Sequence, residues 1–592
     1  MNELNFKPNY RAKLPRTDFN MSQTFGFSAA PGMLLPVYQD FLNAGESEYF
    51  SGNLFARTQP LVTAAMCDVD VYLDWFFVPL QMLYLNAGSL RWQTNDFLSS
   101  AAMAQSVSGY FPLVSLEDVF DEFMDGDANY YSDAPDYELF GSAVANSFRL
   151  LNHLGLNPYA AFRGVVSDPA DMQHDMHSPN IFPMFALAYQ AIYQDYYRVP
   201  LDDRIKRNIK SFNLDYMAVQ ESGASVLNID SFGIFELRFR PLHMDYFTSV
   251  KVSPILAAMN LSDGLPSTAA LSAIDNYLYT TNDNTPNIMT RVNPNQVKGV
   301  EQNITNGTSP YTTNTLNPAN IRSMFALEKL LRITGRARKD YDSQVLAHLG
   351  FDVPHDVKHE LTHLGTDKAI LHIGEVTSMA DTFDGTDGSA LGSISGKGYV
   401  NISGKKRKFT APVDGVIMAV YSCVPRFRYN GCFDKQNSVT KWLDLYVPEF
   451  DRLGMQPLYV YEAECGVAGS SSNRSGWQYR YEQWKRKYDR VTEAFAAPVR
   501  PNSVNQYSAW MLSRLPFASS SAITESSLTP QNFLCPPTAL NDIMVMPYDT
   551  EWNEDYPENP WLMFGRDPFI CEFGANVKKV STMSRFGEPV LD

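Results

Sequence analysis

Segments rich in β-branched and aromatic residues occur near both ends of the chain. Near the N-terminus, residues 54–60 and 69–79 have this character, and each segment closes on a proline. Such runs between turn-forming residues are typical of β-strands. Later segments of the same kind, each bounded by Gly or Pro, are 415–424, 442–447, 458–461 and 561–580. The pattern predicts a mainly β protein whose strands come early and late in the sequence.

Between these strands, apolar residues recur at helical spacing in two places. In residues 181–197, aromatic and aliphatic side chains recur every three or four positions, with Pro183 near the start and Pro200 beyond the end. This spacing places them on one face, so we expect a helix that packs an aromatic stripe into the core. A second helix is predicted for residues 321–331.

Two long segments are predicted to be surface insertions of a single domain spanning residues 1–592. From Trp92 to Phe148 there is no Lys or Arg while acidic residues accumulate. Uncompensated charge of this kind belongs on a solvated surface, so we expect an acidic surface insertion at 92–180. Residues 255–319 are rich in Asn, Thr, Ser and Pro, which favours a polar surface loop.

Part of the acidic insertion begins like a calcium-binding loop. Residues 125–129 read DGDAN, but Tyr130 stands where such a loop needs glycine, and Asp136 stands where it needs glutamate. The glycine permits the sharp turn and the glutamate binds the ion through both oxygens. We therefore interpret the segment as an exposed acidic loop without a bound ion.

Composition and charge exclude some classes of protein. Aromatic residues make up 13% of the chain, which favours strands and contact surfaces. The formal net charge of −17 argues against a protein that coats nucleic acid through its own charge alone. The six cysteines form no CxxC pair, which indicates reduced thiols of a cytoplasmic product. A polar start and the lack of a long apolar run predict a soluble protein with no membrane segment.

One motif suggests an enzyme. His359, Glu360 and His363 fit the pattern H-E-x-x-H, which on a helix binds zinc through both imidazoles and uses the glutamate as a general base. Pro354 and Gly365 leave a helix of roughly ten residues at most, and a third ligand at the extended spacing is missing. We interpret the string as an exposed polar helical turn, with a zinc metalloprotease as the alternative.

A series of segments has the order of one known family. The segments are PGMLLPVYQDFLNAGESEYF (31–50), VYLDWFFVPLQMLY (71–84), AYQAIYQDYYR (188–198), MDYFTSVKVSP (244–254), THLGTDKAILHIGEVTSM (362–379), 398–429, 447–459, 476–495 and 566–591. Together they resemble the major capsid protein of microviruses, the small tailless single-stranded-DNA phages, in particular the gokushovirus-like branch. The acidic region and the loop at 255–319 depart from that family.

The resemblance implies a fold and a function. The expected fold is an eight-stranded antiparallel jelly roll with long insertions containing short helices. The expected function is that of a structural protein, not an enzyme and without a cofactor. Sixty copies, the number that icosahedral symmetry requires, would form a T=1 shell around a circular single-stranded DNA genome. A receptor-binding spike would also suit the aromatic β content, but not the order of the segments.

Partners and location follow from the same resemblance. The expected partners are other copies of the chain, a small basic DNA-packaging protein, a DNA pilot protein, the genome and a host-surface receptor. The expected location is the virion, after assembly in the host bacterial cytoplasm. We predict that a basic arm at residues 1–17 and the C-terminal end face the DNA through Lys7, Arg11, Lys13, Arg16, Lys578, Lys579 and Arg585. Solvated surface charges or subunit ion pairs are an equally good account of these side chains. For the densest basic run, Lys405 to Lys408, we make no prediction of whether it faces inward or outward.

Overall fold

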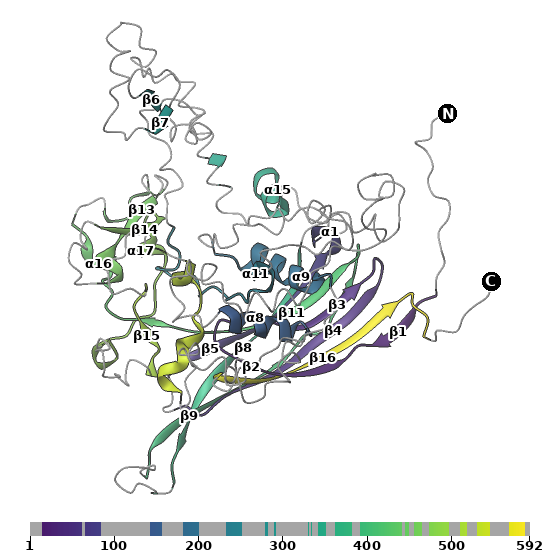
Figure 1. Cartoon of the computed structure of the whole chain (residues 1–592). Helices are drawn as coiled ribbons and strands as arrows, with labels where there is room; N and C mark the ends of the chain where they lie inside the picture. The colour runs from purple at the N-terminus through teal and green to yellow at the C-terminus, as the bar shows by residue number, and fades with distance from the viewer. Residues whose placement is uncertain are drawn as a thin grey trace.

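The fold is seen in a computed structural model of the chain. It describes residues 15–61, 66–83, 143–156, 181–199, 232–251, 279–281, 289–291, 329–330, 333, 341–350, 361–379, 381, 391–440, 444–448, 451, 455–464, 473–496, 510–517, 528, 530–544 and 567–585. Within these residues the predicted mainly β character is confirmed, and one large antiparallel sheet dominates the molecule (Figure 1).

This sheet curls into two facing layers, as in a jelly-roll sandwich. The first layer has the order β3 (Leu35–Leu42), β11 (Gly415–Pro425), β5 (Asp68–Pro79) and β8 (Thr362–Thr377). The second layer continues through β9 (Ile394–Ser403) to β4 (Ser47–Thr58) and β16 (Phe569–Ser581). Its remaining strands are β10 (Arg407–Thr410) beside β4, and β1 (Thr17–Asn20) and β2 (Gln23–Ala29) beside β16.

Strand burial follows from position in the sheet. Every residue of β11 is buried, because β3 and β5 flank it and both of its faces are covered. Gly415 at its start leaves room for the neighbouring strand, since an added Cβ would lie 2.5 Å from the Val78 carbonyl oxygen. By contrast, β16 alternates buried and exposed residues along its length, which shows that its outer face is open in the isolated subunit.

Large aromatic side chains fill the space between the layers. The Trp75 ring of β5 lies 4.5 Å from the Phe50 ring of β4, centroid to centroid. Farther along, Phe27 of β2 meets Tyr421 of β11 at 5.1 Å, edge to face. These contacts join strands from the two layers, so the aromatic content noted in the sequence provides much of the core.

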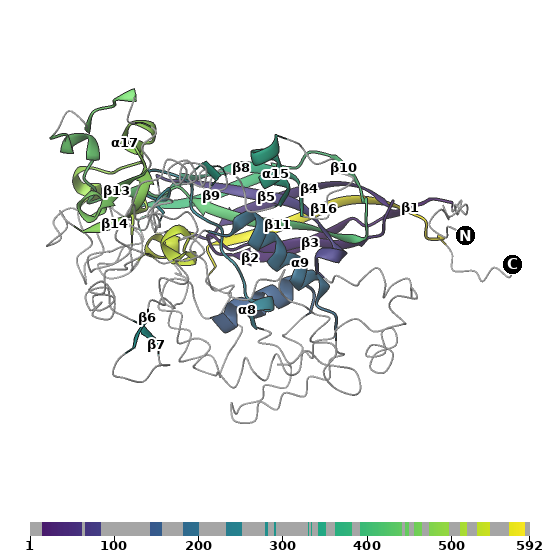
Figure 2. The same ribbon diagram turned by 90° about the horizontal axis from the view of Figure 1, so that it is seen from above.

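Short helices cover the outer face of the first layer. They are α8 (Ala143–His153), α9 (Met184–Ile192), α11 (Phe232–Phe235) and α1 (Leu80–Leu83), and α8 and α9 lie beside β3 and β11 (Figure 2). The predicted helix at 181–197 is confirmed as α9 and the π-helical turn η4 (Tyr193–Tyr197). A buried bidentate ion pair at 2.6 and 2.7 Å joins Arg149 of α8 to Asp567 before β16. This part of the predicted acidic insertion is therefore packed against the sheet.

A buried carboxylate fastens the aromatic helix to the sheet. Asp74 of β5 is fully buried and accepts hydrogen bonds from the Tyr197 hydroxyl at 2.5 Å and from Arg240 at 2.7 Å. Thr366 of β8 donates to the other oxygen of Asp74. Burial and the neighbouring carboxylate raise the pKa of Tyr197, which keeps its proton available for donation. Three separate segments thus meet at one side chain.

A smaller group of elements extends from one end of the sheet. It contains the hairpin of β13 (Met455–Tyr459) and β14 (Arg474–Tyr479), followed by α17 (Glu482–Lys485). The remaining elements of the described chain, not all of which belong to this group, are β6 (Tyr279–Thr281), β7 (Met289–Arg291), α15 (Tyr341–Leu349), β12 (Arg428–Tyr429), η8 (Lys435–Ser438), α16 (Val460–Ala463), η11 (Glu493–Ala496), β15 (Ser513–Arg514), η13 (Pro530–Phe533) and η14 (Pro537–Ile543).

Two of the predicted strands need correction. Residues 444–448 are not a strand, because Asp444 accepts bonds from the Thr440 amide and hydroxyl and closes a local turn. The segment 458–461 is strand only to Tyr459, where the Glu462 side chain accepts the Tyr459 amide and starts α16. The predicted helix at 321–331 lies mainly outside the described residues, although Lys329 and Leu330 are helical.

A buried acid lies at one end of the space between the layers. Glu48 of β4 accepts the Tyr38 hydroxyl at 2.7 Å through one oxygen, and its other oxygen has no hydrogen-bond partner among the described residues. Burial raises the pKa of Glu48 to about 7, against the opposing effect of the Tyr38 bond. Asp40 and Glu46 add to the rise, and Lys579 reduces it.

This carboxyl predicts a pH dependence of stability. Because its folded-state pKa lies above the usual 4.5, the penalty for its charge is absent at low pH and grows as the pH rises through 4.5 to 7. We expect Glu48→Gln to exceed the unaltered chain in free energy of unfolding by up to about 3 kcal/mol near pH 8, and by little near pH 4.5. Urea titrations at both pH values measure this difference, and a difference independent of pH would contradict the assignment.

Candidate nucleic-acid interface

The outer face of the second layer brings basic side chains from distant parts of the sequence together. Alternation along β16 exposes Lys578 and buries Lys579. In the sheet register, Lys578 stands opposite Tyr49 of β4, and Tyr49 stands opposite Lys408 of β10. The Lys408 ammonium lies 5.2 Å from the centroid of the Tyr49 ring. Two cations and one exposed aromatic ring therefore form a single cross-strand row.

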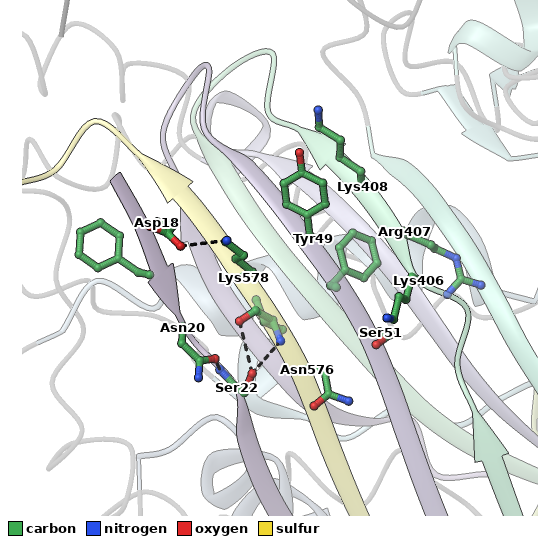
Figure 3. Close-up of a pocket in the computed structure, with 13 residues that line it drawn as sticks. Asp18, Asn20, Ser22, Tyr49, Ser51, Lys406, Arg407, Lys408, Asn576 and Lys578 are labelled. Atoms are coloured by element: carbon green, nitrogen blue, oxygen red, sulfur yellow. Dashed lines mark hydrogen bonds and ion pairs between the residues drawn. The ribbon is translucent and has the colours of Figure 1, made fainter. Parts of the chain in front are cut away.

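An open pocket of about 500 Å³ follows this row (Figure 3). Its polar lining comes from β1, β4, β10, β16 and residues next to them, and consists of Asp18, Asn20, Ser22, Tyr49, Ser51, Lys406, Arg407, Lys408, Asn576 and Lys578. Arg407 is engaged by a bidentate pair with Asp367 at 2.6 and 2.7 Å, while Lys406 and Lys408 are exposed beside it. Lys406 and Lys408 therefore lie on the same outer surface of the second layer as Lys578, and we call this surface of β1, β4, β9, β10 and β16 the basic face.

One acid interrupts the cations. Asp18 of β1 pairs with the Lys578 ammonium at 2.9 Å and with Arg585 at 3.3 Å. The hydrogen bond and charge of Lys578 hold the pKa of Asp18 below its usual value. Because all three side chains are at least half exposed, water screens these pairs, and the two cations are accessible to an anionic ligand.

Aromatic rings continue along the same face. On β4, Phe55 and Arg57 point outward like Tyr49, and the register places Tyr399 of β9 opposite Arg57. The Tyr399 side chain is 70% exposed. From Tyr49 to Arg57 the strand spans roughly 27 Å at about 3.3 Å per residue. Exposed rings interleaved with cations and amides are the features that bind single-stranded nucleic acid, because bases stack on rings while cations contact phosphates.

The seven side chains predicted to face DNA fall into three groups, of which the third consists of Lys579 alone. Lys7, Arg11 and Lys13 lie outside the described residues. Arg16, Lys578 and Arg585 are exposed at or beside the basic face, and their contact with DNA stays a prediction. Sequence inspection overlooked Tyr49, Phe55 and Tyr399, although the period-two alternation of β4 and β9 carries that signal.

Lys579 is placed differently from its neighbour. Its ammonium points between the layers, where it pairs with Asp40 at 2.8 Å and lies 3.7 Å from Glu46. Only 5% of the residue is exposed. This charge already serves to hold β16 against β3 within one subunit. Its proposed contact with DNA remains untested, but its ammonium is turned away from the basic face.

The H-E-x-x-H string does not form a helical turn at its described end. His359 and Glu360 lie outside the described residues, while Thr362 and His363 begin strand β8 by pairing with Phe77 and Phe76 of β5. The His363 ring stacks on Tyr196 at 4.9 Å, and its Nε2 lies 3.0 Å from the Thr366 hydroxyl. Sheet pairing has overridden the local helical pattern, so the exposed helical turn expected there was wrong at these positions.

No group of three or more His, Cys, Asp or Glu side chains within the described residues could hold a metal ion. No helix in the described part of the chain is long and apolar enough to cross a membrane.

Comparison with known proteins identifies the family. The family model described as capsid protein (F protein) matches residues 162–556, about two thirds of the chain. Capsid protein VP1 of Chlamydia phage 1 is 24% identical over 281 residues, which cover 46% of this chain and 42% of that relative. The strands β1, β4 and β16 of the basic face lie outside the family match, whereas β10 lies within it. The resemblance to microvirus capsid proteins is confirmed, and the chain belongs to the phage capsid protein (F protein) family.

Proposed function

We propose that the chain is the major capsid subunit of a microvirus, and that sixty copies form a T=1 icosahedral shell around a circular single-stranded DNA genome. The observation that carries this proposal is the two-layered antiparallel sheet of a chain that belongs to a phage capsid family. A jelly-roll sandwich leaves the loops at its ends free for contacts with neighbouring subunits. The virion is then its location, after assembly in the host cytoplasm.

The basic face supports a DNA-lining role for the second layer. Lys406, Lys408 and Lys578 supply phosphate contacts there, and Tyr49, Phe55 and Tyr399 supply stacking surfaces for unpaired bases. With a net charge of −17, the subunit needs other cations to neutralise a genome. A small basic packaging protein meets this need, and a DNA pilot protein is a further expected partner.

The insertions give the remaining roles. We propose a single domain in which the basic arm at 1–17 faces the DNA, while the acidic segment at 92–180, apart from the packed helix α8, and the polar loop at 255–319 carry outer-surface contacts, including any host receptor. The role is structural rather than catalytic. A metalloprotease gains no support, because His363 is held in a strand against Tyr196.

Electron microscopy of the expressed protein, or of phage particles that carry it, tests the proposal. We expect icosahedral particles of roughly 250–300 Å, the size of sixty packed subunits of this mass. Persistent monomers under all assembly conditions, together with phage particles that lack the chain, would contradict it. Trimers or pentamers without shells would indicate a spike instead.

A further inference from the structure

A two-stranded arm projects beyond the end of the large sheet. The arm consists of residues 374–377 at the end of β8 and 394–396 at the start of β9, together with the adjoining residues 378–379 and 391–393, and it leaves the body of the molecule as one unit (Figure 1). Leu61 holds its base, exchanging two backbone bonds of 3.0 and 3.2 Å with Gly396. Outward from that point, within the described residues, the two strands pair only with each other.

Both faces of this arm are open in the isolated subunit. The last four residues of β8, Gly374 to Thr377, are all exposed, although alternate residues of a strand point to opposite faces. Its exposed apolar side chains are Val376, Met379, Leu391 and Ile394, and Met379 is 90% exposed. A two-stranded ribbon of this kind is marginally stable in water by itself and gains from burial against another surface.

A second apolar surface lies on the smaller group of elements. It consists of Val439, Leu445, Tyr446 and Trp484, all exposed, and we call it the Trp484 patch. The patch is built on firm supports. The Tyr446 ring lies 5.4 Å from the buried Tyr481 ring, and the Trp484 amide donates to the Tyr481 carbonyl. Gln436 of η8 donates to the Gln483 carbonyl of α17 and holds the two turns together.

The charges around the two surfaces are opposite. The described charges at the arm are the exposed acids Glu375 and, two residues beyond Met379, Asp381, together with one exposed cation at its base, Lys397 opposite Gly374, so acids predominate. Beside Trp484 stand Lys485, Arg486 and Lys487, whose acidic partners Asp451, Glu482 and Asp434 are each less exposed than the cation they bind. The outermost charges of the patch are therefore positive. Complementary potentials of this kind orient two surfaces as they meet.

We propose that the β8–β9 arm of one subunit binds the Trp484 patch of a neighbouring copy. This inference rests on the proposed shell. The two surfaces belong to different parts of one chain, so each copy offers both, and the contact is heterologous. Contacts of this class close into rings about a rotation axis, which an icosahedral shell requires at its five-fold and three-fold positions. The apolar side chains of the arm supply buried area, and the rim charges set its direction.

Charge reversal tests the contact between the arm and the Trp484 patch, and the combination of both reversals is the control. The arm variant is Glu375→Lys with Asp381→Lys, and the patch variant is Lys485→Glu with Lys487→Glu. We expect each to lower the yield of particles by about tenfold, because reversal brings like charges together at the rim of the contact. Combining all four substitutions should restore the yield to within about threefold. Unchanged yields for the separate variants, or no recovery in the combination, would overturn the proposal.

Cross-linking in assembled particles gives an independent readout. Oxidation of particles carrying Met379→Cys and Val439→Cys should link subunits into covalent dimers and larger rings. The matched control joins Met379→Cys to Leu349→Cys, which is also highly exposed but lies on α15. Linking in the control pair alone, or in neither pair, would overturn the assigned patch. Failure of the unaltered chain to form particles at all would instead refute the shell itself.

Discussion

Replacing Asp74 with Ala is expected to lower the free energy of unfolding of the subunit by about 3–5 kcal/mol, the effect of removing one partner from a buried ion pair. The loss leaves the Arg240 guanidinium, which is only 15% exposed, without its carboxylate. It also removes the acceptor of the Tyr197 and Thr366 hydroxyl groups. The helix of aromatic residues would then lose its strongest polar attachment to β5.

A matched control exists on the same strand. Asp68 of β5 also pairs with a histidine and an arginine, but its side chain is 41% exposed. Because water screens exposed pairs, Asp68→Ala should cost less than about 1 kcal/mol. Urea unfolding followed by tryptophan fluorescence, to which the buried Trp75 contributes, measures both variants. Equal losses for Asp68→Ala and Asp74→Ala would show that the buried network does not hold the helix.

Removing three charges from the basic face is expected to weaken binding of single-stranded DNA by about 100-fold near 0.1 M salt. The variant combines Lys406→Ala, Lys408→Ala and Lys578→Ala. Each cation that contacts a phosphate releases a counterion, so the slope of log affinity against log salt should also fall by about 2. Titration of unassembled subunits with an oligothymidine at several salt concentrations gives both quantities.

Equal charge removal elsewhere separates a site from a net-charge effect. Lys485→Ala, Arg486→Ala and Lys487→Ala remove the same charge at the Trp484 patch, on a different part of the molecule. This control should leave the salt slope within about 0.5 of its original value if contacts there are few. Similar losses in the two triple variants would mean that DNA senses overall charge, and the basic face would lose its assigned role.

The sequence pattern predicted the central strands well and the edges poorly. β5 and β11 were predictable because both of their faces are covered, so nearly all of their residues are buried, and such strands read as continuous apolar runs. The start of β8 was not predictable, since polar residues such as Thr362 and His363 become strand only by pairing with β5. The jelly-roll arrangement came from the resemblance to a family rather than from periodicity.

The candidate interface was predictable only in part, because it depends on register. Lys578 and Arg585 could be named from charge, but Lys579 could not be separated from Lys578 without knowing which face of β16 is buried. Tyr49 and Lys408 are neighbours through a pairing of strands that lie far apart in sequence. Pairing over such distances leaves no trace in local composition.

The position of β16 has a consequence for how the subunit is made. This strand lies between β4 and the strands β1 and β2, so one edge of β4 lacks its partner until β16, about 500 residues later in the sequence, has been synthesised. At about 10 residues per second, that wait is on the order of a minute. During synthesis the edge of β4 remains unpaired and open to pairing with other nascent chains. Lys578 reaches the basic face only when β16 has paired, so a nascent chain that still lacks β16 cannot display the complete face to DNA.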